Sequence, residues 1–152
     1  METLIVYYSY TNNTEKIAKK IAELKNYDIL KLEPLVEYST NYQKVVDEEE
    51  KKMGDEEIVN LKPINIDLNK YDRIILGTPV WWYTMTPVVR SFLYSNNISN
   101  KKVIVFATNG GWPGHTIEDM NKYCHVDSYI DLKFNGDKIQ DNEKLLSWIN
   151  DL

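Results

Sequence analysis

Three apolar segments dominate the chain of 152 residues, and each of them runs into a polar stretch. They extend from Thr3 to Ser9, from Arg73 to Val80 and from Lys102 to Asn109. Their nearly continuous apolar, β-branched character predicts strands covered on both faces, as in a parallel sheet. Two weaker segments, Tyr27–Glu33 and Val126–Phe134, predict two further strands.

Helical patterns occupy the chain between these strands. Apolar residues at helical spacing predict three buried stripes: Ile17, Ala18, Ile21 and Ala22; Val88, Val89, Phe92 and Leu93; and Leu145, Leu146 and Ile149. Thr86 followed by Pro87 is typical of an N-cap and a first helical position. Asp141 or Asn142 is expected to start the last helix, and Thr116–Asp119 resembles a capping box.

The alternation of strands and helices predicts an α/β sheet with right-handed crossovers, in a single domain spanning residues 1–152. The segment between Leu32 and Tyr71 is the exception, because it is acidic and longer than a simple crossover helix. Its charge run, Asp47–Lys52 with Asp55–Glu57, is expected to form a solvated helix face. A docking surface for a partner is the alternative interpretation.

Composition and charge limit the classes of function. Apolar residues make up 43% and charged residues 27% of the chain, and the net charge is −5. This charge disfavours general binding to nucleic acids or anionic membranes. No run approaches the roughly 20 apolar residues of a membrane span. The single cysteine, Cys124, excludes an intrachain disulfide, so we expect a reduced cytoplasmic protein.

The loop after the first strand, Ser9–Thr14, combines hydroxyl and amide side chains with the start of a helix. It contains Ser9, Tyr10, Thr11, Asn12, Asn13 and Thr14. Unpaired N–H groups and the helix dipole make such a loop an anion site built from neutral donors. It matches neither a Walker A loop nor G-x-G-x-x-G, which favours a single phosphate. Simple capping of the helix is the alternative.

The loop after the second strong strand is rich in aromatic residues. Trp81, Trp82 and Tyr83 follow Pro79 and Val80, and the next helix already has its own buried stripe. Aromatic faces at a strand end can form a platform for a flat ring. One of the two tryptophans, but not both, is expected to pack in the core.

The loop after the third strong strand is rich in glycine. Thr108 and Asn109 lead into Gly110 and Gly111, and Trp112 and Gly114 follow. Glycines allow the backbone to approach a ligand closely, and Trp112 is a further candidate for a ring wall. His115 is expected to be a polar surface residue rather than a ligand contact. None of the three loops offers a nucleophile with a base or a metal-ligand spacing, which indicates that a cofactor performs the chemistry.

These loops together resemble those of the flavodoxin family. Ser9–Thr14 is similar to the family's phosphate loop, Gly77–Trp82 to its first flavin loop and Thr108–Gly111 to its second. The resemblance implies a three-layer α/β/α fold with a five-stranded parallel sheet in the order 2-1-3-4-5. It also implies one noncovalent FMN, with its phosphate on the first loop and its ring system between the other two.

The sequence departs from the family pattern in the phosphate loop and in the flavin loops. Asn12 stands where the family has glycine, and asparagine is the other residue that best tolerates a positive φ. The stretch Pro79–Thr84 contains no glycine, so a carbonyl flip toward the reduced flavin is disfavoured. No acidic residue occurs in either flavin loop before Glu118. Both departures indicate a carrier whose potential is not very low.

The resemblance implies a redox protein, and several functions remain open. The leading hypothesis is an electron carrier that docks transiently to redox protein partners, a reductase and an acceptor, with Glu48–Glu50 or Glu56–Glu57 steering them. The alternative is an enzyme of the quinone or azo reductase type that uses NAD(P)H and a small electron acceptor. A flavin-binding regulatory or storage module is a third class.

Overall fold

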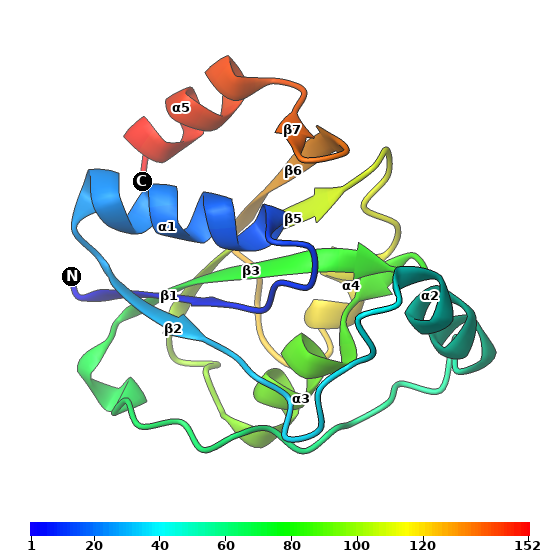
Figure 1. Ribbon diagram of the computed structural model, residues 1–152. Helices are drawn as coiled ribbons and strands as arrows, with labels where there is room; N and C mark the ends of the chain where they lie inside the picture. Colours follow the sequence, from blue (N-terminus) through cyan, green and yellow to red (C-terminus); the bar gives the residue numbers. More distant parts are fainter.

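Five parallel strands form the centre of the protein, whose computed structural model describes residues 1–152 (Figure 1). They are β1 (Thr3–Tyr7), β2 (Asp28–Lys31), β3 (Arg73–Trp81), β5 (Lys102–Asn109) and β6 (Ser128–Asn135). Their order across the sheet is β2-β1-β3-β5-β6. Numbered among the parallel strands alone, this is the predicted 2-1-3-4-5 order, so the fold class is confirmed.

Two short strands that the sequence did not predict bring the sheet to seven strands. β4 (Thr84–Met85) pairs antiparallel with β3, and β7 (Lys138–Ile139) pairs antiparallel with β6. A strand of two residues is too short to show an alternation of polar and apolar positions. Both strands form hairpins at the carboxyl end of a parallel strand, where they extend the loops of that edge.

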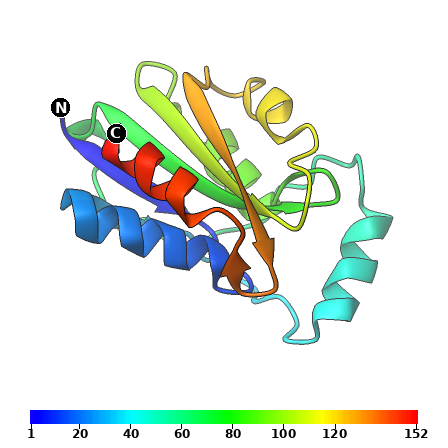
Figure 2. The same ribbon diagram turned by 90° about the horizontal axis from the view of Figure 1, so that it is seen from above.

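The two faces of the sheet bury two separate cores. Strand β1 shows the alternation, because Leu4 and Val6 belong to one core and Ile5 and Tyr7 to the other. The helices are α1 (Asn13–Lys25), α3 (Pro87–Ser95), α4 (Thr116–Met120) and α5 (Asn142–Asn150). Helices α1 and α5 cover one face, and α3 and α4 lie on the other (Figures 1 and 2).

Two of the predicted helix starts are confirmed. The side chain of Thr86 accepts a hydrogen bond from the N–H of Val89, 3.4 Å away, at the start of α3. Asp141 caps α5 in the same way and accepts from the N–H of Lys144 at 2.9 Å. The predicted stripe of α5 is wrong at Leu146, which remains 41% exposed while its neighbour Leu145 is buried.

The capping box predicted at Thr116–Asp119 is wrong. Helix α4 starts after His115, whose side chain makes no capping hydrogen bond. Thr116 is already the first helical residue, and its hydroxyl donates to the carbonyl of Pro113 at 2.6 Å. The carboxylate of Asp119 instead accepts hydrogen bonds from Thr84 and His115, so tertiary contacts replace the local cap.

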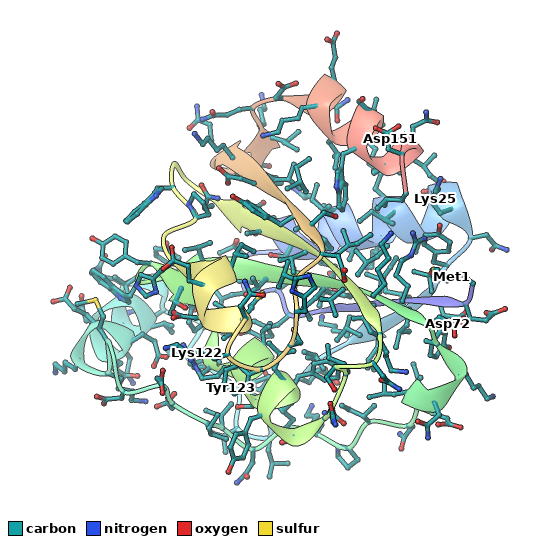
Figure 3. The ribbon with its side chains drawn as sticks, turned by 180° about the vertical axis from the view of Figure 1, so that it is seen from behind. Met1, Lys25, Asp72, Lys122, Tyr123 and Asp151 are labelled. Carbon is teal, nitrogen blue, oxygen red and sulfur yellow. The ribbon has the colours of Figure 1, made fainter.

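The long crossover between β2 and β3 contains one α-helix, α2 (Tyr42–Lys51), and a 3-10 turn at Leu68–Lys70. Between them the chain covers one face of the sheet, with partly buried side chains at Val59, Leu61, Ile64 and Ile66. Helix α2 lies beyond the carboxyl ends of the strands, apart from the other helices (Figures 1 and 2). Figure 3 shows Met1, Lys25 and Asp72 at the opposite end of the molecule.

The acidic run of the crossover only partly follows the prediction of a solvated helix face. Asp47, Glu48 and Glu50 of α2 are exposed, as expected. Glu49 is buried, so the prediction is wrong for this residue, because its position on α2 faces the body of the protein together with Val45. None of the helices combines the length and the apolar character that crossing a bilayer requires.

Candidate functional site

The loop after β1, the last residues of β3 and of β5, and the start of the loop after β5 line one cavity of about 440 Å³ at the carboxyl edge of the sheet. Its lining comprises Tyr10, Thr11, Asn13, Tyr42, Pro79, Val80, Trp81, Thr108, Asn109, Gly110, Phe134, Gly136 and Asp137. Nine of these residues belong to the three loops singled out in the sequence. The remaining loop residues singled out in the sequence, Ser9, Asn12, Thr14, Trp82, Tyr83, Gly111, Trp112 and Gly114, are not part of this lining.

The loop from Ser9 to Thr14 presents backbone donors at the start of α1. Asn12 is the N-cap, and its φ of 74° is the left-handed conformation that the missing glycine requires. No group of the protein accepts the N–H groups of Thr11, Asn12, Asn13 or Thr14. Four consecutive unpaired N–H groups at the positive end of a helix form an anion site.

The hydroxyl side chains of this loop have different roles. Ser9 Oγ accepts the N–H of Glu15 at 3.1 Å, which ties the loop to the first turn of α1. Thr14 is buried, and its hydroxyl is hydrogen-bonded to that of Thr108 at 2.7 Å. Thr11 is exposed, lines the cavity and has no partner within the protein, so its hydroxyl is free to bind a ligand.

Asn13 connects the first loop to the end of β6. Its side-chain N–H donates to the carbonyl of Gly136 at 2.9 Å, across 123 positions of sequence. Its side-chain oxygen is buried and has no hydrogen-bond partner. Asn13 therefore holds the turn between β6 and β7 against the anion site and leaves one polar atom unsatisfied beside the cavity.

The two tryptophans point to different surroundings. The ring of Trp81 packs edge-on against Tyr8, Tyr10 and Tyr38, with ring centroids 6.0, 5.6 and 5.0 Å away, and it also lines the cavity. Trp82 does not line this cavity; its indole N–H donates to the carbonyl of Val46 at 2.9 Å and fastens α2. Trp81 is the tryptophan that packs on the core, as expected for one of the pair.

Trp82 and Tyr83 form the turn of the hairpin between β3 and β4. Both have positive φ values, 48° and 70°, as in a type I′ turn, which glycine and asparagine normally occupy. Bulky residues are strained in this conformation, so other contacts must hold it. The N–H of His115 donates to the carbonyl of Tyr83 at 2.7 Å, which leaves this carbonyl fixed.

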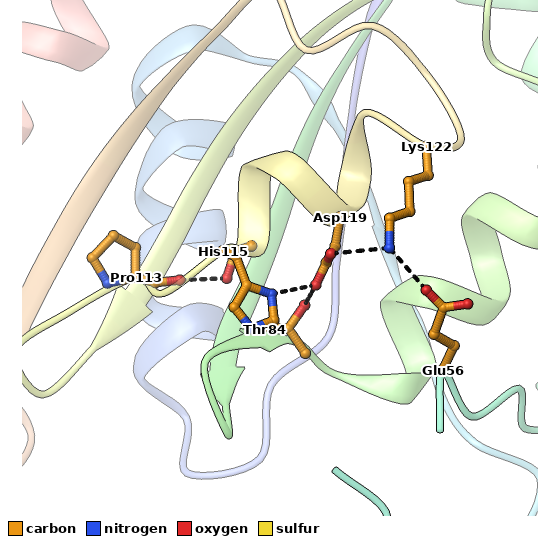
Figure 4. Close-up of polar contacts among 7 residues, drawn as sticks. Glu56, Thr84, Pro113, His115, Asp119 and Lys122 are labelled. Atoms are coloured by element: carbon orange, nitrogen blue, oxygen red, sulfur yellow. Dashed lines mark hydrogen bonds and ion pairs between the residues drawn. The ribbon is translucent and has the colours of Figure 1, made fainter. Parts of the chain in front are cut away.

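A network of polar side chains supports the hairpin from the side of α4 (Figure 4). The carboxylate of Asp119 accepts hydrogen bonds from the Thr84 hydroxyl at 2.5 Å and from His115 Nδ1 at 2.6 Å. Lys122 Nζ lies 3.4 Å from Asp119 and 2.9 Å from Glu56 of the crossover segment. Burial raises the pKa of Asp119, but the bonds from Thr84 and His115 outweigh it and lower the pKa overall.

The third loop opens its backbone to the cavity. Asn109 accepts the N–H of Gly111 at 2.9 Å and also donates to Asp131, so the start of the loop is fixed. A methyl group added at Gly110 or Gly111 would meet no atom within 4 Å, so these residues leave free space beside their backbone. The ring of Trp112 packs on Tyr83 with centroids 5.4 Å apart, and neither residue belongs to the cavity lining.

Gly114 has a packing role in this loop. Its φ is 61°, and a side chain there would come within 2.1 Å of the carbonyl oxygen of Tyr83. Only glycine permits this approach of the third loop to the hairpin. Gly114 therefore allows the contact by which His115 holds the Tyr83 carbonyl.

Comparison with known proteins agrees with this arrangement. The family model of flavodoxin matches residues 2–152. The chain belongs to the flavodoxin family. A comparison with curated proteins finds no match.

Solved structures share the fold of this flavodoxin. A flavoprotein from Lactobacillus acidophilus in complex with FMN is 23% identical, with a TM-score of 0.76 and 97% of each chain covered. A candidate flavoprotein from Bacteroides uniformis is 23% identical, with a TM-score of 0.82, and 98% of this chain and 97% of that chain are covered. Oxidised flavodoxin 1 from Bacillus cereus is 19% identical, with a TM-score of 0.55 and coverages of 99% and 95%.

Four residues that line the cavity were not predicted from the sequence. Phe134, Gly136 and Asp137 come from the hairpin between β6 and β7, and Tyr42 comes from the first turn of α2. The dipeptide Asn135-Gly136 is a turn signal that could have revealed the hairpin. Tyr42 gives no such signal, because only the path of the crossover brings it to the cavity.

Proposed function

We propose that this protein binds FMN at the carboxyl edge of its sheet and transfers electrons between protein partners. The observation that carries the proposal is the set of four unpaired N–H groups from Thr11 to Thr14, in a loop whose Thr11 and Asn13 line a cavity together with aromatic and glycine residues. A flavin mononucleotide combines one phosphate with a flat ring system, so its two ends match the two parts of this site.

The residues of the site fit this cofactor. The N–H groups of the first loop and the hydroxyl of Thr11 would hold the phosphate. Trp81, Tyr10 and Tyr42 would form an aromatic wall for the ring system, and Gly110 would leave room for it on the other side. Flavin would supply the redox chemistry, since it accepts and donates electrons, and the protein would bind and orient it.

The lining of the proposed ring site is nearly uncharged, although the acidic helix α2 lies next to it. Burial raises the pKa of Tyr8 and of Tyr38, and nearby glutamates raise both further, so these phenols stay neutral. Asp137 is the one carboxylate in the cavity lining. Because little negative charge opposes electron uptake, we expect a midpoint potential that is not very low.

Helix α2 supports the role of an electron carrier. It carries four carboxylates and two lysines beside the cavity, and Asp47, Glu48 and Glu50 are exposed. An acidic surface next to a redox site steers basic partners and permits transient docking. A reductase and an acceptor protein are the partners that this proposal implies, in the cytoplasmic location expected from the single cysteine.

A specific observation favours the reductase alternative. Tyr83 of the hairpin and Trp112 of the third loop are 46% and 61% exposed and pack on each other. Exposed aromatic rings at this position could stack a quinone or an azo compound while NAD(P)H delivers hydride. This alternative uses the same FMN site and differs in the acceptor.

An anaerobic reductive titration of the FMN-loaded protein, followed by visible absorbance, tests the proposal. A carrier is expected to take up electrons in two resolved one-electron steps and to oxidise NAD(P)H slowly. Rapid NAD(P)H oxidation with a quinone and a single two-electron step would replace the carrier by the reductase. Protein that cannot be loaded with FMN would contradict both.

A further inference from the structure

A second cavity, separate from the proposed flavin site, lies behind the hairpin of β3 and β4. Its volume is about 290 Å³, and it is bounded by the hairpin, α3, α4 and the stretch that follows α2. Trp81 borders both cavities, whereas the first loop and the glycine-rich residues border only the flavin cavity. The second cavity is therefore not an extension of the phosphate site.

Arg90 of α3 lines this second cavity and makes no ion pair. Arg90 is only 5% exposed to solvent, and its Nη1 is buried without a hydrogen-bond partner. No carboxylate lies within the 4.0 Å of an ion pair. A buried guanidinium without a partner is unfavourable, because the protein interior solvates the charge poorly.

The other cations of the cavity are already shared between carboxylates. Lys52 lies 3.5 Å from Glu49 and 2.8 Å from Glu57. Lys122 bridges Glu56 and Asp119 at 2.9 and 3.4 Å (Figure 4). Arg90 is thus the one lysine or arginine of this cavity that makes no ion pair, and its charge reaches Glu56 only at longer range.

The only other arginine of the chain shows how this protein normally satisfies such a group. Arg73 donates to the Thr3 hydroxyl at 3.0 Å and to the Tyr27 hydroxyl at 2.7 Å. Its guanidinium also lies over the ring of Tyr27, 5.4 Å from the centroid. The contrast indicates that the partner of Arg90 comes from outside the chain.

We propose that the second cavity binds a small organic carboxylate, with its carboxylate on Arg90 and its apolar body against Trp81, Trp82 and Met85. A guanidinium holds a carboxylate through two parallel hydrogen bonds. A phosphate monoester is a poorer match, because the surrounding carboxylates repel a dianion more strongly than a monoanion. Trp81 borders both this site and the flavin cavity, and the proposed carboxylate site does not require bound FMN.

A titration of the FMN-loaded protein with benzoate tests this proposal, with the indole N–H signals of the four tryptophans recorded by NMR. Saturable shifts are expected for Trp81 and Trp82, with little change for Trp148. Benzamide, which lacks the charge, should bind at least about tenfold more weakly. Equal binding of benzamide and benzoate would overturn the proposal, as would the absence of saturation.

Two arginine variants form a matched pair. Arg90→Met is expected to weaken benzoate binding at least about tenfold, whereas Arg73→Met, which removes the same charge elsewhere, should leave it unchanged. Equal benzoate binding in the parent and Arg90→Met would overturn the proposal. If Arg90→Met does not fold, Arg90→Lys replaces it, since lysine keeps the charge but loses the bidentate geometry.

Two further controls define the site and the ligand class. The benzoate shifts of Trp82 should be the same with and without FMN, because Trp82 lines the second cavity and not the flavin cavity, whereas Trp81 borders both. Shifts that disappear when FMN is bound would place benzoate on the α1 terminus and overturn the proposal. Inorganic phosphate should not displace benzoate, and displacement at similar concentration would overturn the assignment to a monoanion.

Discussion

Thr11 and Thr14 illustrate how similar side chains in one loop differ in function. The Thr11 hydroxyl is exposed and unpaired, whereas the Thr14 hydroxyl is buried against that of Thr108. Thr11→Ala is expected to leave the free energy of unfolding unchanged and to weaken FMN binding by roughly 1–2 kcal/mol. The measurements are urea unfolding of the protein without flavin and fluorescence titration with FMN.

Thr14→Ala is the matched variant of the same loop. It leaves the buried hydroxyl of Thr108 without a partner and should cost about 1–2 kcal/mol of stability in addition to its effect on FMN. If both variants bind FMN like the parent, the loop is only a helix cap.

Asn12 and Asn26 stand at the two ends of α1, and both have left-handed backbones, with φ of 74° and 55°. Replacement of either by alanine should destabilise the protein by roughly 1 kcal/mol, because a Cβ without an amide disfavours this conformation. Only Asn12→Ala should also weaken FMN binding, since only Asn12 shapes the anion loop. A loss of FMN affinity in Asn26→Ala would show that the effect comes from global destabilisation.

At the scale of the element, α2 is fastened by Trp82 and buries Glu49 against the body of the protein. Burial raises the pKa of Glu49, and repulsion by Glu57 raises it further, while Lys52 opposes this. Because the pKa of Glu49 is raised in the folded state, the stability that its protonated form contributes is complete below the ordinary pKa of 4.5. This contribution is lost as the pH rises through the folded-state pKa.

Glu49→Gln has no buried carboxylate to ionise, so it avoids this loss of stability and is expected to raise the melting temperature at pH 7. The difference from the parent should vanish below about pH 4.5, where the parent's glutamate is protonated in both states. Thermal unfolding between pH 4 and pH 8 measures it, with the exposed Glu48→Gln as the control. A lower melting temperature of Glu49→Gln at pH 7 would show that the ion pair with Lys52 dominates instead.

The hairpin of β3 and β4 depends on Asp119. Asp119→Ala removes the acceptor of Thr84 and His115 and should cost roughly 1–3 kcal/mol of stability. Because the pKa of Asp119 is lowered in the folded state, its contribution is present above the ordinary value of 3.8 and is lost as the pH falls through the folded value. Denaturant unfolding from pH 3 to pH 7 measures this cost.

The neighbouring Glu118 provides the control for this experiment. It is exposed on the same helix, so Glu118→Ala should change stability by less than about 0.5 kcal/mol. A cost for Asp119→Ala that does not diminish at low pH would contradict the assigned role of the carboxylate.

Elements with strong local patterns could be predicted from the sequence. The strand Lys102–Asn109 has the predicted bounds, and Thr86 and Asp141 cap the helices that they were expected to cap. Interactions between distant segments left no local pattern. The carboxylate of Asp119 is used by the hairpin rather than by its own helix, so the predicted capping box failed.

The candidate site shows the same division. Thr11, Trp81 and Gly110 come from loops that directly follow strong strands, and the topology of a parallel sheet brings such loops together. Arg90 gave no signal in the sequence, because it lies among the buried residues of α3 at ordinary helical spacing. That its Nη1 has no partner becomes visible only when the surrounding side chains are in place.

At the scale of the whole molecule, the chemistry gathers at one end of the sheet. The three loops, the hairpin and α2 all lie at the carboxyl edge, and the termini lie toward the other end (Figure 1). The net charge of −5 includes the exposed carboxylates of α2, so a basic partner would be steered toward the cavity. An arrangement with the cavity and the acidic helix at the same end suits the proposed exchange of electrons at one surface.

The central claim is that the unpaired N–H groups at the start of α1 bind the phosphate of FMN. The most direct test is to titrate the flavin-free protein with FMN and with riboflavin, which lacks the phosphate, and to follow flavin fluorescence. We expect one FMN per chain and binding at least about 100-fold tighter than that of riboflavin, as several charge-assisted hydrogen bonds require. Equal affinities for the two flavins, or no binding of FMN, would contradict the account.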